Sequence, residues 1–206
     1  MTSATGCSPA PSVAARSSAP SAAFWQTHLR FSEPAAFTWL AAAYRVHQRL
    51  LLAWPDGQAG RILWRAWPRD LEIIVRHPAE ADWRRAFAGF YCQPDVRQEA
   101  RSLPLAAGDD LEFALLANVC RRDVRTGRRT GAGVDRDAWL RRKLDKAGAA
   151  IIDHRATELR DAPPRRGGED LTSRRVDFAG RLRVTNGAAL DAAMTEGIGA
   201  SKGLGC

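Results

Sequence analysis

A tyrosine and a histidine lie three residues apart in the segment Tyr44-Arg-Val-His47-Gln48. On a helix this spacing puts both side chains on one face, where they can meet the same substrate atom. A histidine with an ordinary pKa near 6.5 can accept or donate a proton close to neutral pH. The pair is therefore a candidate for acid–base chemistry. The alternative, that His47 is simply a buried, hydrogen-bonded histidine on an apolar stripe, stays open.

The element that must position this pair is a helix predicted over Ala35–Trp54. Ser32 can cap its start, Pro34 fits its first turn, and the segment Pro55-Asp56-Gly57 ends it. Its expected apolar stripe repeats at intervals of four, three, four and three residues. The stripe consists of Leu40, Tyr44, His47, Leu51 and Trp54.

Alternating and helical patterns surround this helix in a recognisable order. The predicted elements are strand Phe24–Phe31, the helix, strands Arg61–Trp67 and Leu71–Val75, helix Ala79–Phe90 and strand Asp95–Leu103. The βαββαβ order is typical of a ferredoxin-like unit.

The order then repeats without its last strand. The predicted elements are strand Asp110–Asn118, helix Asp135–Ala149, strand Ile151–Leu159, a strand over Ser173–Thr185 with a break at Gly180, and helix Gly187–Glu196 capped by Asn186. We therefore predict an α+β fold of two tandem ferredoxin-like domains, residues 24–105 and 108–206, the second lacking its last strand. Residues 1–23 are rich in Ser, Ala and Pro and are expected to be a disordered extension.

The segment Gly197–Cys206 contains four glycines and one lysine, Lys202. Glycine allows another backbone to approach closely. The spacing does not fit a P-loop or a dinucleotide-binding loop, so ATP or NAD binding is not expected. Contact with a nucleic acid backbone and a flexible tail are both compatible with it.

Positive charge dominates the composition, with 31 Lys and Arg against 23 Asp and Glu, a net charge of +8 and a pI near 10.1. Such a field attracts polyanions. Two segments are especially basic. One contains Arg121, Arg122, Arg125, Arg128 and Arg129, and the other contains Arg160, Arg165, Arg166, Arg174 and Arg175. Both segments can equally be solvated loops, so their charge alone does not show that the protein binds RNA.

Several other classes of protein are not indicated. The four cysteines are far apart, and the histidines lack metal-binding spacing, so no metal or cofactor is expected. Asp109 and Asp110 would point to opposite faces of a strand. No apolar run approaches the length of a membrane span. We expect a reduced, cytoplasmic protein without a membrane partner.

Together these motifs resemble the CasE family, CRISPR-associated endoribonucleases of type I-E systems. The resemblance rests on Tyr44-x-x-His47-Gln48, Phe113–Asn118 (FALLAN), Trp139-Leu-Arg-Arg-Lys143-Leu144, Phe178-Ala-Gly-x-Leu182 and the ending Gly197-Ile-Gly-x-x-Lys202-x-x-Gly205-Cys206. It extends from about Phe24 to Cys206.

The resemblance implies metal-independent cleavage of precursor CRISPR RNA at repeat stem-loops by attack of a 2′-hydroxyl. His47 would be the general acid or base, and Tyr44 would orient or stabilise the phosphate. Lys202, Gly199 and Gly203 would contact RNA from the glycine loop. Arg160, Arg165, Arg166, Arg174 and Arg175 would do so from a basic hairpin. The product RNA would stay bound, and the protein would join other subunits of the Cascade complex.

This chain departs from the family pattern at both ends. It carries the extension 1–23 and stops where the family continues into a final apolar strand. We therefore expect a C-terminally truncated protein. An alternative function is a catalytically impaired subunit that binds an RNA hairpin without cutting it. A third hypothesis is a protein-interaction module with arginine-rich loops and no role in RNA binding.

Overall fold

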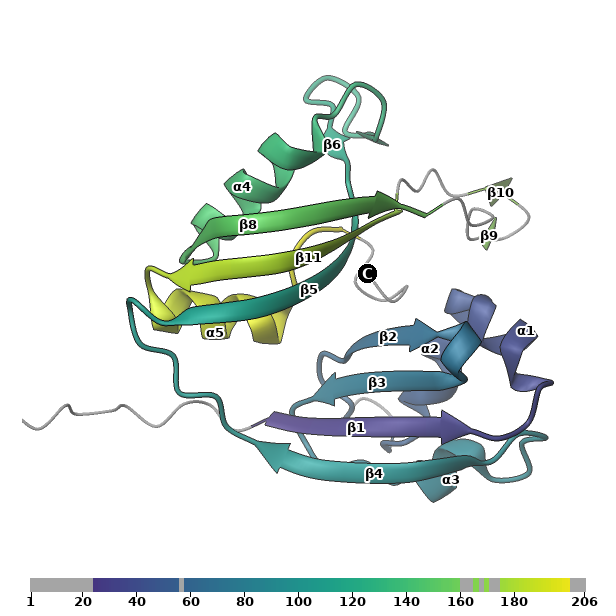
Figure 1. Cartoon of the computed structure of the whole chain (residues 1–206). Helices are drawn as coiled ribbons and strands as arrows, with labels where there is room; N and C mark the ends of the chain where they lie inside the picture. Colours follow the sequence, from purple (N-terminus) through teal and green to yellow (C-terminus); the bar gives the residue numbers. More distant parts are fainter. Residues whose placement is uncertain (1–23, 56–57, 160–164, 167–168, 171–174, 201–206) are drawn as a thin grey trace, which may run out of the picture.

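Two antiparallel sheets, each with helices packed on one face, organise the chain (Figure 1). The computed structural model describes residues 24–55, 58–159, 165–166, 169–170 and 175–200. The predicted extension 1–23 lies outside these residues. The α+β class with tandem ferredoxin-like units is confirmed by the order of the elements and by the sheet topology below.

The first unit follows the predicted order of elements. Its elements are β1 (Phe24–Phe31), α1 (Ala36–Ala41), α2 (Ala43–Leu51), β2 (Leu63–Trp67), a 3₁₀ turn at Pro68–Asp70, β3 (Glu72–His77), α3 (Trp83–Phe87) and β4 (Pro94–Arg101). The strand order is β2-β3-β1-β4, and every neighbouring pair is antiparallel. This is the order in which a βαββαβ unit closes its sheet, with the first and third strands in the centre.

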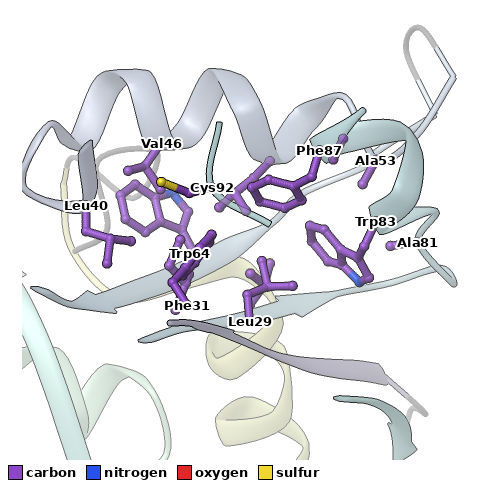
Figure 2. Packing of buried hydrophobic residues seen from close by; sticks show 14 of the residues in the cluster. Leu29, Phe31, Leu40, Val46, Ala53, Trp64, Ala81, Trp83, Phe87 and Cys92 are labelled. Atoms are coloured by element: carbon purple, nitrogen blue, oxygen red, sulfur yellow. The ribbon is translucent and has the colours of Figure 1, made fainter. Parts of the chain in front are cut away.

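Alternation along these strands separates a core face from an open face. Leu29, Ile73 and Trp64 point to the helices and are almost fully buried. Figure 2 shows this core, with side chains from the strands meeting those of the helices above them. Phe87 and Phe31 pack edge to face with their ring centroids 5.8 Å apart, a favoured geometry for aromatic pairs.

The predicted single helix is broken at Ala42, whose φ of −89° and ψ of 71° are not helical. No glycine or proline marks the break, and alanine is the strongest helix former. Tertiary packing accounts for the break. At about 100° per residue, Leu40 would lie about 120° from Val46 on a straight helix. The break allows both side chains to be buried.

Two other details of the helix prediction are wrong. No side chain caps the start of α1, so Ser32 does not act as a cap. The buried face of α2 runs through Val46 and Leu50, about one position away from the predicted stripe, and Leu51 is exposed.

The second unit also follows the predicted order. Its elements are β5 (Asp110–Asn118), the short pair β6 (Arg121–Arg122) and β7 (Arg129–Thr130), α4 (Arg136–Lys146), β8 (Ala149–Glu158), the short pair β9 (Arg165–Arg166) and β10 (Glu169–Asp170), β11 (Arg175–Val184) and α5 (Gly187–Glu196). The three long strands form an antiparallel sheet in the order β5-β11-β8. Residues 201–206 lie outside the described part of the chain, so the predicted absence of a last strand is not tested.

The chain after α5 returns to the edge of this sheet. Asn118, at the end of β5, forms an antiparallel bridge with Ala200. Trp139, Phe178 and Leu140 are buried between the sheet and its helices. The segment that follows α5 therefore starts beside β5, opposite the edge occupied by β8.

The sequence predicted a break in this strand at Gly180. This prediction is wrong, because β11 continues from Arg175 to Val184. A Cβ atom on Gly180 would lie 2.2 Å from the carbonyl oxygen of Asp153 on β8. The register between β11 and β8 shifts just beyond this point, between Arg181 and Leu182. Because glycine has no Cβ atom, it allows β11 and β8 to approach closely at this position.

Candidate active site and RNA-contact residues

Helix α2 is fixed to the first unit from two sides. Val46 and Leu50 have no exposed surface and pack on the sheet. On another side of the helix, the guanidinium of Arg49 donates a 3.2 Å hydrogen bond to the carbonyl of Ala86 and lies 4.5 Å from the ring centre of Phe90. These contacts leave the helix little freedom to rotate, which is what a catalytic side chain carried on it requires.

His47 sits at the boundary between the buried and exposed faces of α2. Its Nδ1 atom is buried and has no hydrogen-bond partner among the described residues. Burial lowers the pKa of His47 below its ordinary value, because the charged imidazolium loses hydration there. Since Nδ1 is inaccessible, a substrate can reach this imidazole only through Nε2.

Tyr44 lies one turn before His47 and is 42% exposed. At about 100° per residue the two positions are about 60° apart around the helix. The structure therefore brings Tyr44 and His47 to one side of α2. The predicted stripe implied that Tyr44 lies in the apolar core, and this prediction is wrong, because the side chain is exposed.

His77 shows what a histidine with a structural role looks like in this fold. Its Nδ1 donates to the carbonyl of Ala79 at 2.7 Å, and its Nε2 accepts from the hydroxyl of Thr27 at 2.8 Å. Both ring nitrogens are satisfied, and the side chain is buried. The buried Nδ1 of His47 has no such partner in the described residues, so the satisfied-histidine alternative is less well supported for His47.

The glycine segment is described only up to Ala200, so Lys202 and Gly203 lie outside the described residues. Gly199 has a φ of +93°, and a Cβ atom on it would lie 3.3 Å from the ring of Trp139. This glycine therefore packs against the core of the second unit, next to the bridge between Ala200 and Asn118.

The predicted basic hairpin is described in part. Arg160 and Arg174 lie outside the described residues, and for Arg165 and Arg166 only the backbone pairing of β9 with β10 is described. Arg175 is half-buried and lies opposite Asn118 in the sheet register. Arg175 and Gly199 are thus brought to the same end of β5.

No group of three His, Cys, Asp or Glu side chains suited to a metal ion occurs in the described part of the chain. A shallow cavity of about 750 Å³ lies on the open face of the second sheet, with Glu112, Asp153, Arg155 and Arg181 in its lining. None of the predicted site residues lines this cavity. No helix among the described residues has the length and hydropathy needed to cross a bilayer.

Comparison with known proteins settles the family. The model of the CRISPR associated protein family matches residues 24–206. The chain belongs to this family. The match covers the resemblance found in the sequence, from the strand before Tyr44 to the glycine segment. A search of curated protein sequences finds no match.

Several solved structures in this family share the fold and the order of elements. A CRISPR endoribonuclease Cse3 bound to a 19-nucleotide RNA is 29% identical, with a TM-score of 0.74, over 90% of this chain and 96% of that one. Thermus thermophilus Cse3, bound to an RNA representing a pre-cleavage complex, is 28% identical, with a TM-score of 0.72, over 88% and 95%. The resemblance to CasE proteins is thereby confirmed.

A more distant structure shows the fold alone. Cas6e from Escherichia coli K-12 is 19% identical, with a TM-score of 0.63, over 88% of this chain and 95% of that one. It supports the tandem ferredoxin-like architecture.

Sequence reasoning missed the residues that join the two units. Arg65 on β2 donates a 2.7 Å hydrogen bond to Asp177 on β11. Arg76 on β3 donates to the carbonyl of Met194 at 3.3 Å. The alternation in β2 and β3 already places both arginines on the open face of the first sheet, but nothing in the sequence names their partners.

Proposed function

We propose that this protein is an endoribonuclease that cleaves precursor CRISPR RNA at the repeat stem-loops and needs no metal ion. The similarity to Cse3 structures bound to RNA, over about nine-tenths of both chains, is the observation that carries the proposal. The placement of Tyr44 and His47 on one side of a fixed helix supports it.

The proposed reaction is an internal transesterification. The 2′-oxygen attacks the adjacent phosphorus, the bond from phosphorus to the 5′-oxygen breaks, and a 2′,3′-cyclic phosphate and a 5′-hydroxyl result. Nε2 of a neutral His47 takes the proton of the 2′-hydroxyl. The imidazolium so formed returns a proton to the departing 5′-oxygen. The lowered pKa of His47 supports a neutral imidazole at the start, which is the form that can act as a base.

Tyr44 is proposed to hold the phosphate during this step. Tyr44 is an exposed side chain, and its hydroxyl can donate a hydrogen bond to a non-bridging oxygen, where negative charge increases as the attack proceeds. The remaining contribution is positioning, because the reaction requires the 2′-oxygen in line with the leaving oxygen.

The RNA contacts proposed for binding are those of the glycine segment, Gly199, Lys202 and Gly203, and those of the basic hairpin. The hairpin residues are Arg160, Arg165, Arg166, Arg174 and Arg175. One structural neighbour is described as a CRISPR RNA-guided surveillance complex. We extend the proposal to retention of the product RNA and assembly with Cascade subunits in the cytoplasm.

The test is cleavage of the cognate repeat hairpin in EDTA by the wild type and by His47→Ala. We expect cleavage by the wild type only, with a cyclic phosphate on the upstream product. A requirement for Mg²⁺, or full activity of the variant, would contradict the mechanism. Tight hairpin binding by the wild type without cleavage would select the non-cleaving subunit instead. Absence of RNA affinity at low salt would select a protein-interaction module.

A further inference from the structure

A second arginine-rich hairpin, formed by β6 and β7, is not used by the proposed reaction. The predicted loop folds into a short antiparallel pair in which Arg121 lies opposite Thr130 and Arg122 lies opposite Arg129. Five arginines fall between residues 121 and 129, and all five are exposed. They are Arg121, Arg122, Arg125, Arg128 and Arg129.

The tip of this hairpin is an ordered turn. Asp123 Oδ1 accepts from the amide and the hydroxyl of Thr126, at 2.7 and 3.0 Å. The amide of Asp123 donates to the carbonyl of Arg128 at 2.8 Å, and Gly127 supplies the positive φ of 67°. The hydrogen bonds from Thr126 lower the pKa of Asp123, so its carboxylate is charged and committed to the turn.

The base of the hairpin is held by the core of the second unit. Val119 and Val134, which flank it in sequence, are buried. The indole Nε1 of Trp139 donates a 3.1 Å hydrogen bond to the carbonyl of Cys120. The arginines are therefore presented on a fixed support, which reduces the entropy lost when they bind a partner.

The hairpin contains five arginines and one carboxylate, Asp123, so most of its positive charge is not compensated within the described structure. No carboxylate of a described residue lies within 4 Å of the five guanidinium groups. By contrast, Arg181 and Arg183 on β11 each pair with an aspartate. Arg122 and Arg129 are directly cross-strand, and like charges so placed destabilise a hairpin. An anion bound between them would remove this repulsion.

The position of the hairpin connects it to the proposed RNA interface. β5 leads into β6 at its Asn118 end, and β8 leads toward β9 at its Glu158 end. Both ends lie beside the start of β11, through the register pairs Asn118 with Arg175 and Glu158 with Val176. β5 and β8 flank β11, so these ends of β5 and β8 lie about 10 Å apart, twice the strand spacing. Figure 1 shows both leaving the same end of the sheet.

We propose that the β6–β7 hairpin binds backbone phosphates of the RNA stem, with Arg122 and Arg129 as the central pair. Guanidinium groups match phosphate oxygens with two parallel hydrogen bonds. The inference rests on the proposed function for the identity of the RNA. It adds a second contact surface near this end of the sheet and requires no base recognition.

The test measures the dissociation constant of the repeat hairpin over a range of salt concentrations. For R122Q/R129Q we expect a slope of log Kd against log salt that is smaller by about 1.4–1.8, because each of the two phosphate contacts contributes about 0.7–0.9. At moderate salt we expect about 10-fold weaker binding.

Matched variants separate a specific contact from loss of net charge. R181Q/R183Q removes the same two charges from β11 and should change the slope by much less. R122K/R129K keeps the charges and should restore most of the slope. Circular dichroism and the melting temperature show whether R122Q/R129Q folds. If it folds poorly, R125Q/R128Q, which changes only the tip of the hairpin, is used for a second measurement of the slope.

The outcomes distinguish this inference from the proposed function. Equal slopes for R122Q/R129Q and R181Q/R183Q, with normal cleavage by the wild type, would overturn the inference and leave the endoribonuclease proposal intact. An equal loss of slope on an unstructured RNA of the same length would overturn the assignment to the stem. If the wild type neither binds nor cleaves the repeat hairpin, both proposals fail.

Discussion

The guanidinium of Arg65 donates a 2.7 Å hydrogen bond to Oδ2 of Asp177, which joins β2 of the first sheet to β11 of the second. The two side chains are only 21% and 31% exposed. The guanidinium also lies 4.6 Å from the ring centre of Trp67. This contact helps fix the unit that carries Tyr44 and His47 against the unit that carries the proposed RNA-binding hairpins.

A double-mutant cycle with Arg65→Ala and Asp177→Ala should show a coupling energy of about 1.5–3 kcal/mol in urea unfolding. Solvent and salt screen this partly buried pair less than they screen a surface pair. Hydrogen bonds between charged groups reach this range of energies. The exposed pair of Arg181 with Asp153 is the control and should couple more weakly, because solvent screens exposed charges. Equal coupling for the two pairs would show that Arg65 and Asp177 contribute no more than a surface contact.

His77 should make the folded protein sensitive to acid. Burial lowers the pKa of His77 below its ordinary value near 6.5, because the charged imidazolium loses hydration, so the unfolded chain binds a proton that the folded chain does not. The free energy of unfolding should therefore fall as pH drops below about 6.5, with a slope of up to about 1.4 kcal/mol per pH unit from this group. Above that pH the group adds no pH dependence.

The measurement is denaturant unfolding of the wild type and His77→Gln at pH 7.5 and pH 5.5. At pH 7.5 the variant should be less stable by about 1–3 kcal/mol, because hydrogen bonds to Thr27 and Ala79 are lost. At pH 5.5 the difference should be smaller, because the variant has no proton to take up at this position. A constant difference between the two pH values would contradict the lowered pKa.

Local patterns were sufficient to predict the order of the elements, because alternation and helical periodicity are recorded in nearby residues. β5 and α5 have the predicted bounds, and the Asn186 cap is present, with its Oδ1 accepting from the amide of Ala189 at 3.0 Å. The pairing of Tyr44 with His47 on one helical side depends only on spacing. It could therefore also be predicted.

Features that depend on contacts between distant segments could not be predicted. The break at Ala42 follows from the burial of Leu40 and Val46 on the sheet, and alanine gives no local signal for it. The predicted break at Gly180 is wrong, because the constraint on this position is the backbone of Asp153, 27 residues earlier in the chain. The partner of Arg65 likewise lies in the other unit.

Gly180→Ala should destabilise the second unit by about 1–3 kcal/mol, the range for forcing extra atoms into a packed site. The added Cβ would lie 2.2 Å from the carbonyl oxygen of Asp153 and 2.6 Å from Cα of His154. Neither contact is with a flexible side chain, so β8 must move away from β11. Thermal unfolding of the wild type and Gly180→Ala tests this. An unchanged melting temperature would show that β8 adapts without cost.

The pH dependence of cleavage tests the role proposed for His47. The ratio kcat/KM reports the pKa of the free enzyme, so it should rise with pH and level off, with a midpoint below 6.5. His47→Ala should lower the rate by about 10²–10⁴-fold and abolish this inflection. Tyr44→Phe should lower the rate by about 10-fold or more through loss of one donor to the phosphate, and should keep the midpoint. A rate that falls as pH rises through the same range would make His47 an acid in the first step, because only the neutral imidazole can accept the 2′-hydroxyl proton.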